Sequence, residues 1–482
     1  MSVTIEARLK PDYGGSLQEA IPVLRDWVTT NYGTLSLGQT LDGGDIMGTL
    51  AENIERLVVS DTSEGDALRG VATSTAKIRV HPYKYFKSPP QTVEIPMGNE
   101  AGDCCPTVLM HELPSVNFAA TWDQLFFEPD IKPALLRFVT SILIFSDRGV
   151  SLDCVSWNRI ILLHGGAGSG KTTLCRALAQ KVAMRSFSKF NRTVLLEINT
   201  KTLLSRWFAE SSKLVDALFN WIHTQTASAP DQFFCIMIDE VESLASSRRA
   251  AASANEPADA IRIVNSLLTS LDRLKCRRNV LILTTSNLLE VIDTAFLDRV
   301  DLCQHVAAPS LVATYSILLS CMQELIRCGI IIPENEEVCT LTSKKQPFRS
   351  CSSFPCRRRL NFGLFKRRLT YKGAFHEAVG VSTTKFSLSR IQASLYDYNM
   401  AHVFKTVRPD LPSSKLLAVA AQAKGLSGRA LRRIPLLMHA TSVEDESMGL
   451  SSALDAMRLV VEAEQKSARL AVVANKEVNS TI

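Results

Sequence analysis

The glycine-rich segment at residues 165–172 constrains the fold of this chain more than any other feature. It reads GGAGSGKT and fits G-x-x-x-x-G-K-[ST], the pattern of a loop that binds phosphate groups. Glycines let the backbone curl so that its N–H groups face phosphate oxygens, and the N-terminus of a following helix adds positive charge. We therefore predict a nucleotide site that contains Gly165, Gly166, Ala167, Gly168, Ser169, Gly170, Lys171, Thr172 and Thr173.

Four apolar runs of strand length lie on either side of this loop in the sequence. They are residues 159–164 (RIILLH), 194–198 (VLLEI), 233–238 (FFCIMI) and 280–285 (VLILTT). Because they lack the alternation of a half-exposed strand, they indicate a parallel sheet that is buried on both faces. Helical periods between the runs, such as Leu174, Leu178 and Val182, indicate repeated β-α-β units. The predicted fold class is therefore α/β, a phosphate-loop module with a parallel sheet between helices.

Two acidic residues follow the third run directly. Asp239 and Glu240 come at the carboxyl end of FFCIMI, the end at which parallel sheets bind ligands. We predict that Lys171 contacts the β- and γ-phosphates, and that Thr172 and Asp239 hold Mg²⁺. Glu240 is placed to polarise the attacking water. An acidic pair after an isolated strand usually begins a solvated loop, but the earlier phosphate loop favours the catalytic interpretation.

Five further positions are weaker candidates. Asn287 follows the fourth run and is expected to orient the hydrolytic water. Arg299 and Arg429 are expected to stabilise charge on the transferring phosphoryl group, although an isolated arginine more often forms a surface ion pair. Trp207 and Phe208 lie between a strand and a helix, where they fit either two core aromatics or an exposed gripping loop.

Composition excludes several classes of protein. The chain has 482 residues, 46% apolar and 21% charged, so about two to four globular domains are expected. Neither a run of eighteen apolar residues nor an apolar core near Met1 occurs, so neither a membrane helix nor secretion is predicted. The twelve cysteines form no Cys-x-x-Cys pair, which indicates reduced thiols and argues against zinc. His111 and Glu112 begin a zinc-protease pattern without its second His, so we expect both on the surface.

Positive charge is concentrated between residues 342 and 387. This stretch contains eleven Lys or Arg residues and one acid, whereas the whole chain has a net charge of only +6. It shows no sustained helical or strand period. Three interpretations are open. The stretch is a disordered loop, or it is an insertion that binds nucleic acid, or it is intron sequence that an error in the gene model has included in the protein sequence.

The order of these motifs resembles that of AAA+ ATPases. More narrowly, the chain is similar to the pachytene checkpoint protein 2 family, whose animal member is thyroid-receptor-interacting protein thirteen. The similarity covers residues 118–330 and 387–475 and is weak over residues 1–112. It is carried by the segments 156–165 (SWNRIILLHG), 173–181 (TLCRALAQK), 238–244 (IDEVESL), 259–265 (DAIRIVN), 283–287 (LTTSN) and 425–429 (GLSGR).

The resemblance implies a function that residue spacing does not show. Members of this family are ring-forming, usually hexameric ATPases that use ATP and Mg²⁺ to convert HORMA-domain proteins between closed and open forms, with an adaptor in some cases. Their roles are meiotic chromosome-axis and recombination-checkpoint control and spindle-checkpoint silencing. This implies a nuclear location with a cytoplasmic pool, and association with chromosomes in meiosis. No membrane partner is implied, and nucleic acid is not expected to be the direct substrate.

The resemblance also assigns roles by position. Asn287 matches the first sensor, Arg429 the second sensor, and Arg299 the finger that one subunit supplies to the next. Trp207 and Phe208 match the first pore loop, and the second pore loop falls between Arg248 and Pro257.

Two departures from the family pattern bear on these roles. Gly166 and Ala167 replace the usual Pro-Pro, a change that removes no N–H donor because proline has none. Leu302 stands where many AAA+ rings have a second arginine, so the finger role depends on Arg299 alone.

These features divide the chain into four predicted parts. They are a client- or adaptor-binding domain at 1–112, a large ATPase subdomain at 113–309, a helical lid at 310–475 interrupted by the basic stretch, and a tail at 476–482. Two other functions are open at this point: a nucleic-acid motor or loader that uses the basic stretch, and a scaffold that binds nucleotide without hydrolysing it.

Overall fold

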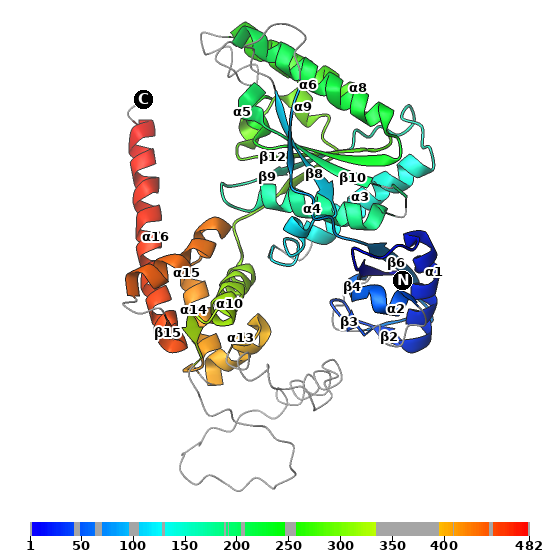
Figure 1. Cartoon of the computed structure of the whole chain (residues 1–482). Coiled ribbons are helices and arrows are strands. Elements are labelled where there is room, and N and C mark those ends of the chain that lie inside the picture. Colours follow the sequence, from blue (N-terminus) through cyan, green and yellow to red (C-terminus); the bar gives the residue numbers. More distant parts are fainter. Residues whose placement is uncertain are drawn as a thin grey trace, which may run out of the picture. The chain divides into compact units, whose positions relative to one another are not determined.

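The computed structural model describes residues 2–42, 49–62, 70–95, 106–127, 131–187, 189–190, 192–203, 208–245, 257–333, 395–407, 409–442 and 447–480. The chain divides into two compact units. The first contains residues 1–317 and 423–433, and the second contains residues 318–422 and 434–482. Figure 1 labels the elements of both units. Within the described part of the chain, no helix is both long and apolar enough to span a membrane.

A seven-stranded sheet forms the centre of the first unit, in the order β13-β9-β12-β11-β10-β8-β7. The strands are β7 (Gln91–Glu94), β8 (Thr107–Leu113), β9 (Ile160–His164), β10 (Arg192–Ile198), β11 (Gln232–Ile238), β12 (Val280–Ser286) and β13 (Leu302–His305). The five strands from β13 to β10 pair in parallel, whereas β8 and β7 run antiparallel at one edge. All four apolar runs are strands of this sheet, so the predicted α/β class is confirmed.

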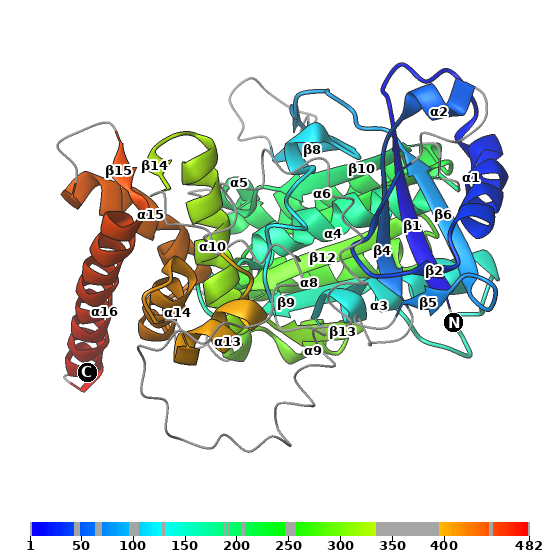
Figure 2. The same ribbon diagram turned by 90° about the horizontal axis from the view of Figure 1, so that it is seen from below.

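Helices cover both faces of this sheet. Its helices are α3 (Ile131–Asp147), α4 (Lys171–Ser186), α5 (Thr200–Leu203), α6 (Phe208–Ser228), α8 (Pro257–Leu274) and α9 (Thr294–Leu297). Successive strand side chains point to opposite faces, so Ile160 joins the core under α6 and α8, while Ile161 joins the core under α3 and α4. Figures 1 and 2 show α6 and α8 lying side by side. Burial on both faces explains why these strands lack polar alternation.

The N-terminal part has a small sheet of its own, in the order β3-β4-β1-β6. Its elements are β1 (Ser2–Leu9), α1 (Leu17–Asn31), β2 (Thr34–Leu35), β3 (Thr40–Leu41), α2 (Thr49–Asn53), β4 (Ile54–Thr62), β5 (Val71–Ala72) and β6 (Lys77–Tyr83). Apolar residues of β1, β4 and α1 form a separate buried core.

β7 and β8 belong to the ATPase sheet, although the sequence analysis places residues up to 112 in the N-terminal domain. β8 pairs with β10 along six residues, and β7 pairs with β8. A strand joins a sheet through its hydrogen-bonded neighbours, which the sequence of a short strand does not reveal. The boundary of the small N-terminal sheet therefore lies between β6 and β7.

The second unit is mostly helical, as predicted for a lid. Its elements are α10 (Leu311–Arg327), β14 (Ile331–Ile332), α13 (Tyr398–Val407), α14 (Pro412–Gln422), α15 (Gly428–Ser442), β15 (Met448–Gly449) and α16 (Leu450–Ser480). Both α10 and α15 begin in the first unit, which contains their residues up to 317 and 433. The apolar period at Leu454, Met457 and Val461 is buried along α16. The basic stretch at 342–387 lies outside the described residues.

Candidate nucleotide site

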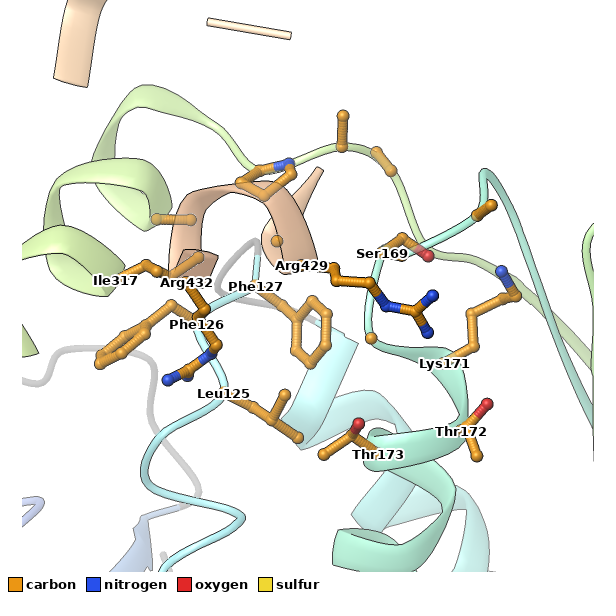
Figure 3. A pocket seen from close by; sticks show the side chains of 18 of the residues that line it. Leu125, Phe126, Phe127, Ser169, Lys171, Thr172, Thr173, Ile317, Arg429 and Arg432 are labelled. Carbon is orange, nitrogen blue, oxygen red and sulfur yellow. The ribbon is translucent and has the colours of Figure 1, made fainter. Parts of the chain in front are cut away.

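A cavity of about 600 Å³ lies beside the glycine-rich loop, and all its lining residues belong to the first unit. Its floor is the loop and the start of α4. One side carries the ends of β11 and β12, and the other carries the segment 121–127 together with the first residues of α10 and α15. Figure 3 shows side chains of the loop, of the segment 125–127 and of α15 around this space. The cavity therefore lies at the carboxyl end of the parallel strands, where the sequence placed it.

The glycine-rich loop adopts a backbone that needs its glycines. Gly165 has φ of 148°, and a Cβ atom there would lie 2.2 Å from the carbonyl oxygen of Val306. Gly170 has φ of 96° and caps the N-terminus of α4. Because only glycine adopts such angles at little cost, the loop can turn directly from β9 into the helix and present its backbone to the cavity.

Lys171 is held in place by three uncharged oxygen atoms. Its Nζ donates to the carbonyl oxygens of Gly165 and Gly166 at 2.8 and 2.9 Å, and to Oδ1 of Asn287 at 2.8 Å. Burial lowers the pKa of Lys171, an effect that the nearby carboxylates of Glu242 and Asp239 oppose. The ammonium group thus lies in the cavity wall with neutral hydrogen-bond partners, an arrangement suited to a phosphate chain.

Asp239 is the centre of a second cluster of oxygen atoms. Its Oδ1 accepts hydrogen bonds from the hydroxyl of Thr172, at 2.8 Å, and from the hydroxyl of Thr285. The Thr285 hydroxyl also accepts from the backbone N–H of Glu240 at 3.1 Å. A carboxylate next to a hydroxyl is the kind of oxygen donor set that Mg²⁺ prefers, so Thr172 and Asp239 fit the predicted metal ligands.

Glu240 and Asn287 are held by different contacts. Glu240 is exposed and lies in the left-handed region, with φ of 54°, a strained backbone that recurs at functional sites. The backbone N–H of Asn287 donates to Oε1 of Glu242 at 3.0 Å. Glu242 and Thr285, neither of which was a sequence candidate, therefore fix the two groups that were.

Arg429 joins the loop from a distant part of the sequence. Its backbone N–H donates to the carbonyl oxygen of Gly168 at 3.2 Å, and its side chain lines the cavity. In Figure 3 its guanidinium group lies on the side of Ser169 and Lys171. The structure thus brings together the phosphate loop, Asp239, Glu240, Asn287 and Arg429.

Arg299 is placed differently from the other candidates. It does not line the cavity. Its Nε and Nη2 atoms donate to the two carboxylate oxygens of Asp272 on α8, each at 2.9 Å, and its Nη1 donates to the carbonyl oxygen of Ala295 at 2.7 Å. The hydrogen bonds to Asp272 raise the pKa of Arg299. One chain therefore does not complete a site that includes all the predicted residues.

The pore-loop candidates cannot be placed in the same way. Trp207 and residues 246–256 lie outside the described residues, and Phe208 is the first residue of α6, with a side chain that is not described.

The expectation that His111 lies on the surface is wrong. His111 on β8 is only 9% exposed, and its Nε2 lies 3.4 Å from Oε1 of Glu197 on β10. Arg176 of α4 donates to both carboxylate oxygens of Glu197, at 2.7 and 2.8 Å. Although burial opposes it, hydrogen bonding by His111 and Arg176 lowers the pKa of Glu197 to about 2. The pairing of β8 with β10 causes this burial, which the local sequence did not reveal.

Three cavity residues were missed because they precede the predicted motifs. Leu125, Phe126 and Phe127 form an apolar wall opposite the polar groups. An ideal Cβ atom at Gly170 would lie 3.5 Å from Cζ of Phe127, so this wall adjoins the start of α4. The run QLFF just before the ATPase core was the available signal, but nothing local distinguishes it from core residues.

The fold and this site together define an AAA ATPase, and residues 161–308 match the model of the ATPase family associated with various cellular activities (AAA). Residues 310–357 and 380–465 match the TRIP13-like, AAA+ ATPase lid C-terminal domain. The chain belongs to the family of pachytene checkpoint protein 2 homologues. The gap between the two lid segments lies inside the basic stretch at 342–387.

Individual relatives cover most of the chain. The pachytene checkpoint protein 2 homolog of Arabidopsis thaliana is 35% identical over 459 residues, which are 94% of this chain and 86% of that protein. The homolog of Homo sapiens is 36% identical over 350 residues, 73% of this chain and 68% of that protein. The solved structure of C. elegans PCH-2 has a TM-score of 0.65 and 25% identity, and covers 97% of this chain and 100% of that one. The predicted family, fold class and ATPase activity are thereby confirmed, and the family binds ATP.

Proposed function

We propose that this ATPase converts HORMA-domain proteins between closed and open conformations, as an Mg²⁺-dependent hexameric ring. The proposal is supported by membership in the pachytene checkpoint protein 2 family and by the family resemblance of its motifs. The observation that supports a ring is the different placement of two arginines. Arg429 lines the nucleotide cavity of its own chain, whereas Arg299 lies outside it and is left to act on the cavity of a neighbouring subunit.

The chemistry follows from the groups around the cavity. Lys171 and the loop N–H groups bind the phosphate chain. Thr172 and Asp239 would hold Mg²⁺, which would supply positive charge to balance the charge that develops during phosphoryl transfer. Glu240 polarises the attacking water, and Asn287 orients it. Arg299 of one subunit stabilises the transition state in the cavity of its neighbour.

The direct test is Glu240→Gln, measured for ATP turnover, ATP binding and client binding. Turnover should fall by roughly 10²–10⁴ while ATP is retained, because only the general base is lost. With ATP, the variant should hold a HORMA-domain protein in a pull-down and fail to release a bound partner peptide from it. Glu290→Gln is the matched control, because Glu290 is exposed and does not line the cavity. If Glu240→Gln leaves remodelling intact, the chain is a nucleotide-assembled scaffold and the proposal is wrong.

The shared site has a test of its own. Arg299→Ala should lower turnover by roughly 10³–10⁵. Mixing this variant with Lys171→Met subunits, which cannot use their own sites, should restore activity in part if the arginine acts on a neighbour. Absence of any restoration would exclude a site shared between subunits.

We further propose a nuclear location with a cytoplasmic pool, and action on meiotic chromosomes and in spindle-checkpoint silencing. Family membership supports this assignment. Imaging of a fluorescent fusion in dividing and meiotic cells tests it, and exclusion from the nucleus in both would refute it.

The nucleic-acid alternative depends on residues 342–387, which lie outside the described residues. It predicts salt-dependent DNA binding that is lost when this stretch is deleted. Sequencing the transcript across residues 335–395 decides first whether the stretch is translated.

A further inference from the structure

The nucleotide cavity has a polar end and an apolar end. The polar end carries Lys171 and Asp239, whose hydrogen bonds are described above. The apolar end carries Leu125, Phe126 and Phe127, together with Ile317 of α10. With the phosphate chain at the glycine-rich loop, a flat nucleobase would lie at the apolar end. Aromatic and aliphatic side chains suit its faces.

The segment that carries this wall is not built into a helix or a strand. Residues 125–127 have neither helical nor strand structure. The turn that precedes them is closed by the N–H of Gln124, which donates to the carbonyl oxygen of Ala120 at 3.1 Å. An irregular segment of this kind needs contacts from elsewhere to keep its side chains in place.

One such contact comes from Arg432 on α15. Its Nη2 atom donates to the carbonyl oxygen of Gln124 at 2.5 Å, across 308 positions of the sequence. This oxygen directly precedes the three apolar residues. A hydrogen bond from a charged donor is stronger than one between neutral groups, so this contact can hold the segment in place.

Arg429 and Arg432 lie three residues apart on the same helix and therefore share a face. Figure 3 shows that they diverge from there. The guanidinium of Arg429 lies toward Ser169 and Lys171, whereas that of Arg432 lies beside Leu125 and Phe126. The same turn of helix thus sends one arginine to the phosphate end of the cavity and the other to the wall at the base end.

We propose that Arg432 is a positioning residue for nucleobase recognition. It holds the carbonyl of Gln124, and through it the side chains of residues 125–127, where the base of ATP binds. Arg432 then strengthens the binding of the nucleoside part of ATP and leaves the binding of the phosphate chain unchanged. The proposal rests on the ATP site of this chain and is independent of any client.

The test compares two ligands on the full-length chain. Binding of ATP and of inorganic tripolyphosphate is measured by calorimetry for the wild type, Arg432→Ala and Arg432→Met. Both variants remove the hydrogen-bond donor, but they lose different amounts of side-chain packing. If one of them does not fold, the other still gives the binding measurement. We expect ATP affinity to fall about tenfold in each, from the lost hydrogen bond, with the affinity for tripolyphosphate changed less than about twofold.

Two further variants distinguish the hydrogen bond to Gln124 from a general effect of positive charge near the cavity. Arg432→Lys keeps a charged donor and should retain most of the ATP affinity. Arg433→Ala removes the same charge from the next residue, which does not line the cavity, and should leave both affinities as in the wild type. Equal weakening of ATP and tripolyphosphate in the Arg432 variants would show that Arg432 acts on the phosphates or on folding. No weakening of ATP binding would also overturn the proposal.

Discussion

Helix α4 carries basic residues near both of its ends, and the two ends hold these charges in opposite ways. At the first residue, Lys171 donates to two carbonyl oxygens and one amide oxygen, all uncharged. Near the last turn, Lys181 and Arg185 meet the carboxylate of Glu6 on β1, at 2.5 and 3.7 Å. A charge held by neutral groups stays available to an anion, whereas a charge matched by a carboxylate is already neutralised.

The ion pairs at the C-terminal end of α4 are also much more buried than a surface ion pair. The side chains of Lys181 and Arg185 are each 11% exposed, and that of Glu6 is 6% exposed. Although burial opposes it, the charges of Lys181 and Arg185 lower the pKa of Glu6. Charges taken out of water in this way are stable only together. One end of α4 is therefore arranged as a binding site, and the other as a structural joint with the small N-terminal sheet.

The largest expected effect comes from breaking the joint. Glu6→Ala leaves Lys181 buried without its carboxylate and leaves Arg185 with Asp61 alone, at 3.5 Å, so the free energy of unfolding should fall by about 3–5 kcal/mol. Denaturant titration of the full-length chain measures it. Glu55→Ala is the matched control, because it breaks the Arg8–Glu55 pair on the same sheet, whose side chains are 32% and 34% exposed, and should change stability by about 1 kcal/mol or less. Equal losses of stability in Glu6→Ala and Glu55→Ala would contradict the structural role assigned to the buried ion pairs of Glu6.

Removing the charge of Lys171 should lower ATP turnover strongly and stability only slightly. Lys171→Met should lower ATP turnover by at least about 10²–10³, the cost of losing one preorganised donor to the reacting phosphates. Because its partners are neutral, no buried charge is left behind, and the unfolding midpoint without nucleotide should shift less than in Glu6→Ala. A steady-state ATPase assay and a melting curve check the two halves. A variant that unfolds like Glu6→Ala would show that Lys171 is also a structural charge.

Acid should weaken the joint through His81 on β6. Burial, and then the charge of Arg185, lower the pKa of His81 to about 4, while Arg79 adds to this effect and Glu6 opposes it. Below pH 6.5 His81 binds a proton in the unfolded chain, whereas in the folded chain it stays neutral until about pH 4. The free energy of unfolding should therefore fall as the pH drops through this window. Melting curves from pH 7.5 to 5 measure the slope. The slope should be shallower in His81→Gln, and an unchanged slope would assign it to other groups.

The smallest expected effect comes from Asp272. Its ion pair with Arg299 is well formed but exposed, with side chains 29% and 50% accessible. Asp272→Ala should therefore change the free energy of unfolding by about 1 kcal/mol or less. A larger loss in denaturant titration would mean that this pair, like the one at Glu6, is structural, and that Arg299 is not readily available to a neighbouring subunit.

The parts of this site that are consecutive in sequence were predictable, and the parts that depend on pairing were not. The loop at 165–172 and the acids after β11 are local patterns whose chemistry follows from their order along the chain. Thr285 and Glu242 hold Asp239 and Asn287 only because β11 and β12 are neighbours in the sheet. Strand order is set by packing of the whole domain, and residues around a single strand carry little record of it.

The sequence by itself determined the class of this protein, because a phosphate loop, acids at a strand end and an amide after the next strand need particular residue types at fixed spacing. The tertiary structure decided which charges are used for binding and which for holding the fold together. Lys171 and Lys181 are the same residue type on the same helix, and only their surroundings differ. A lysine is left available to an anion or becomes half of an ion pair according to the oxygen atoms that the fold places around it, because a buried ammonium group needs hydrogen-bond partners but these can be neutral or charged.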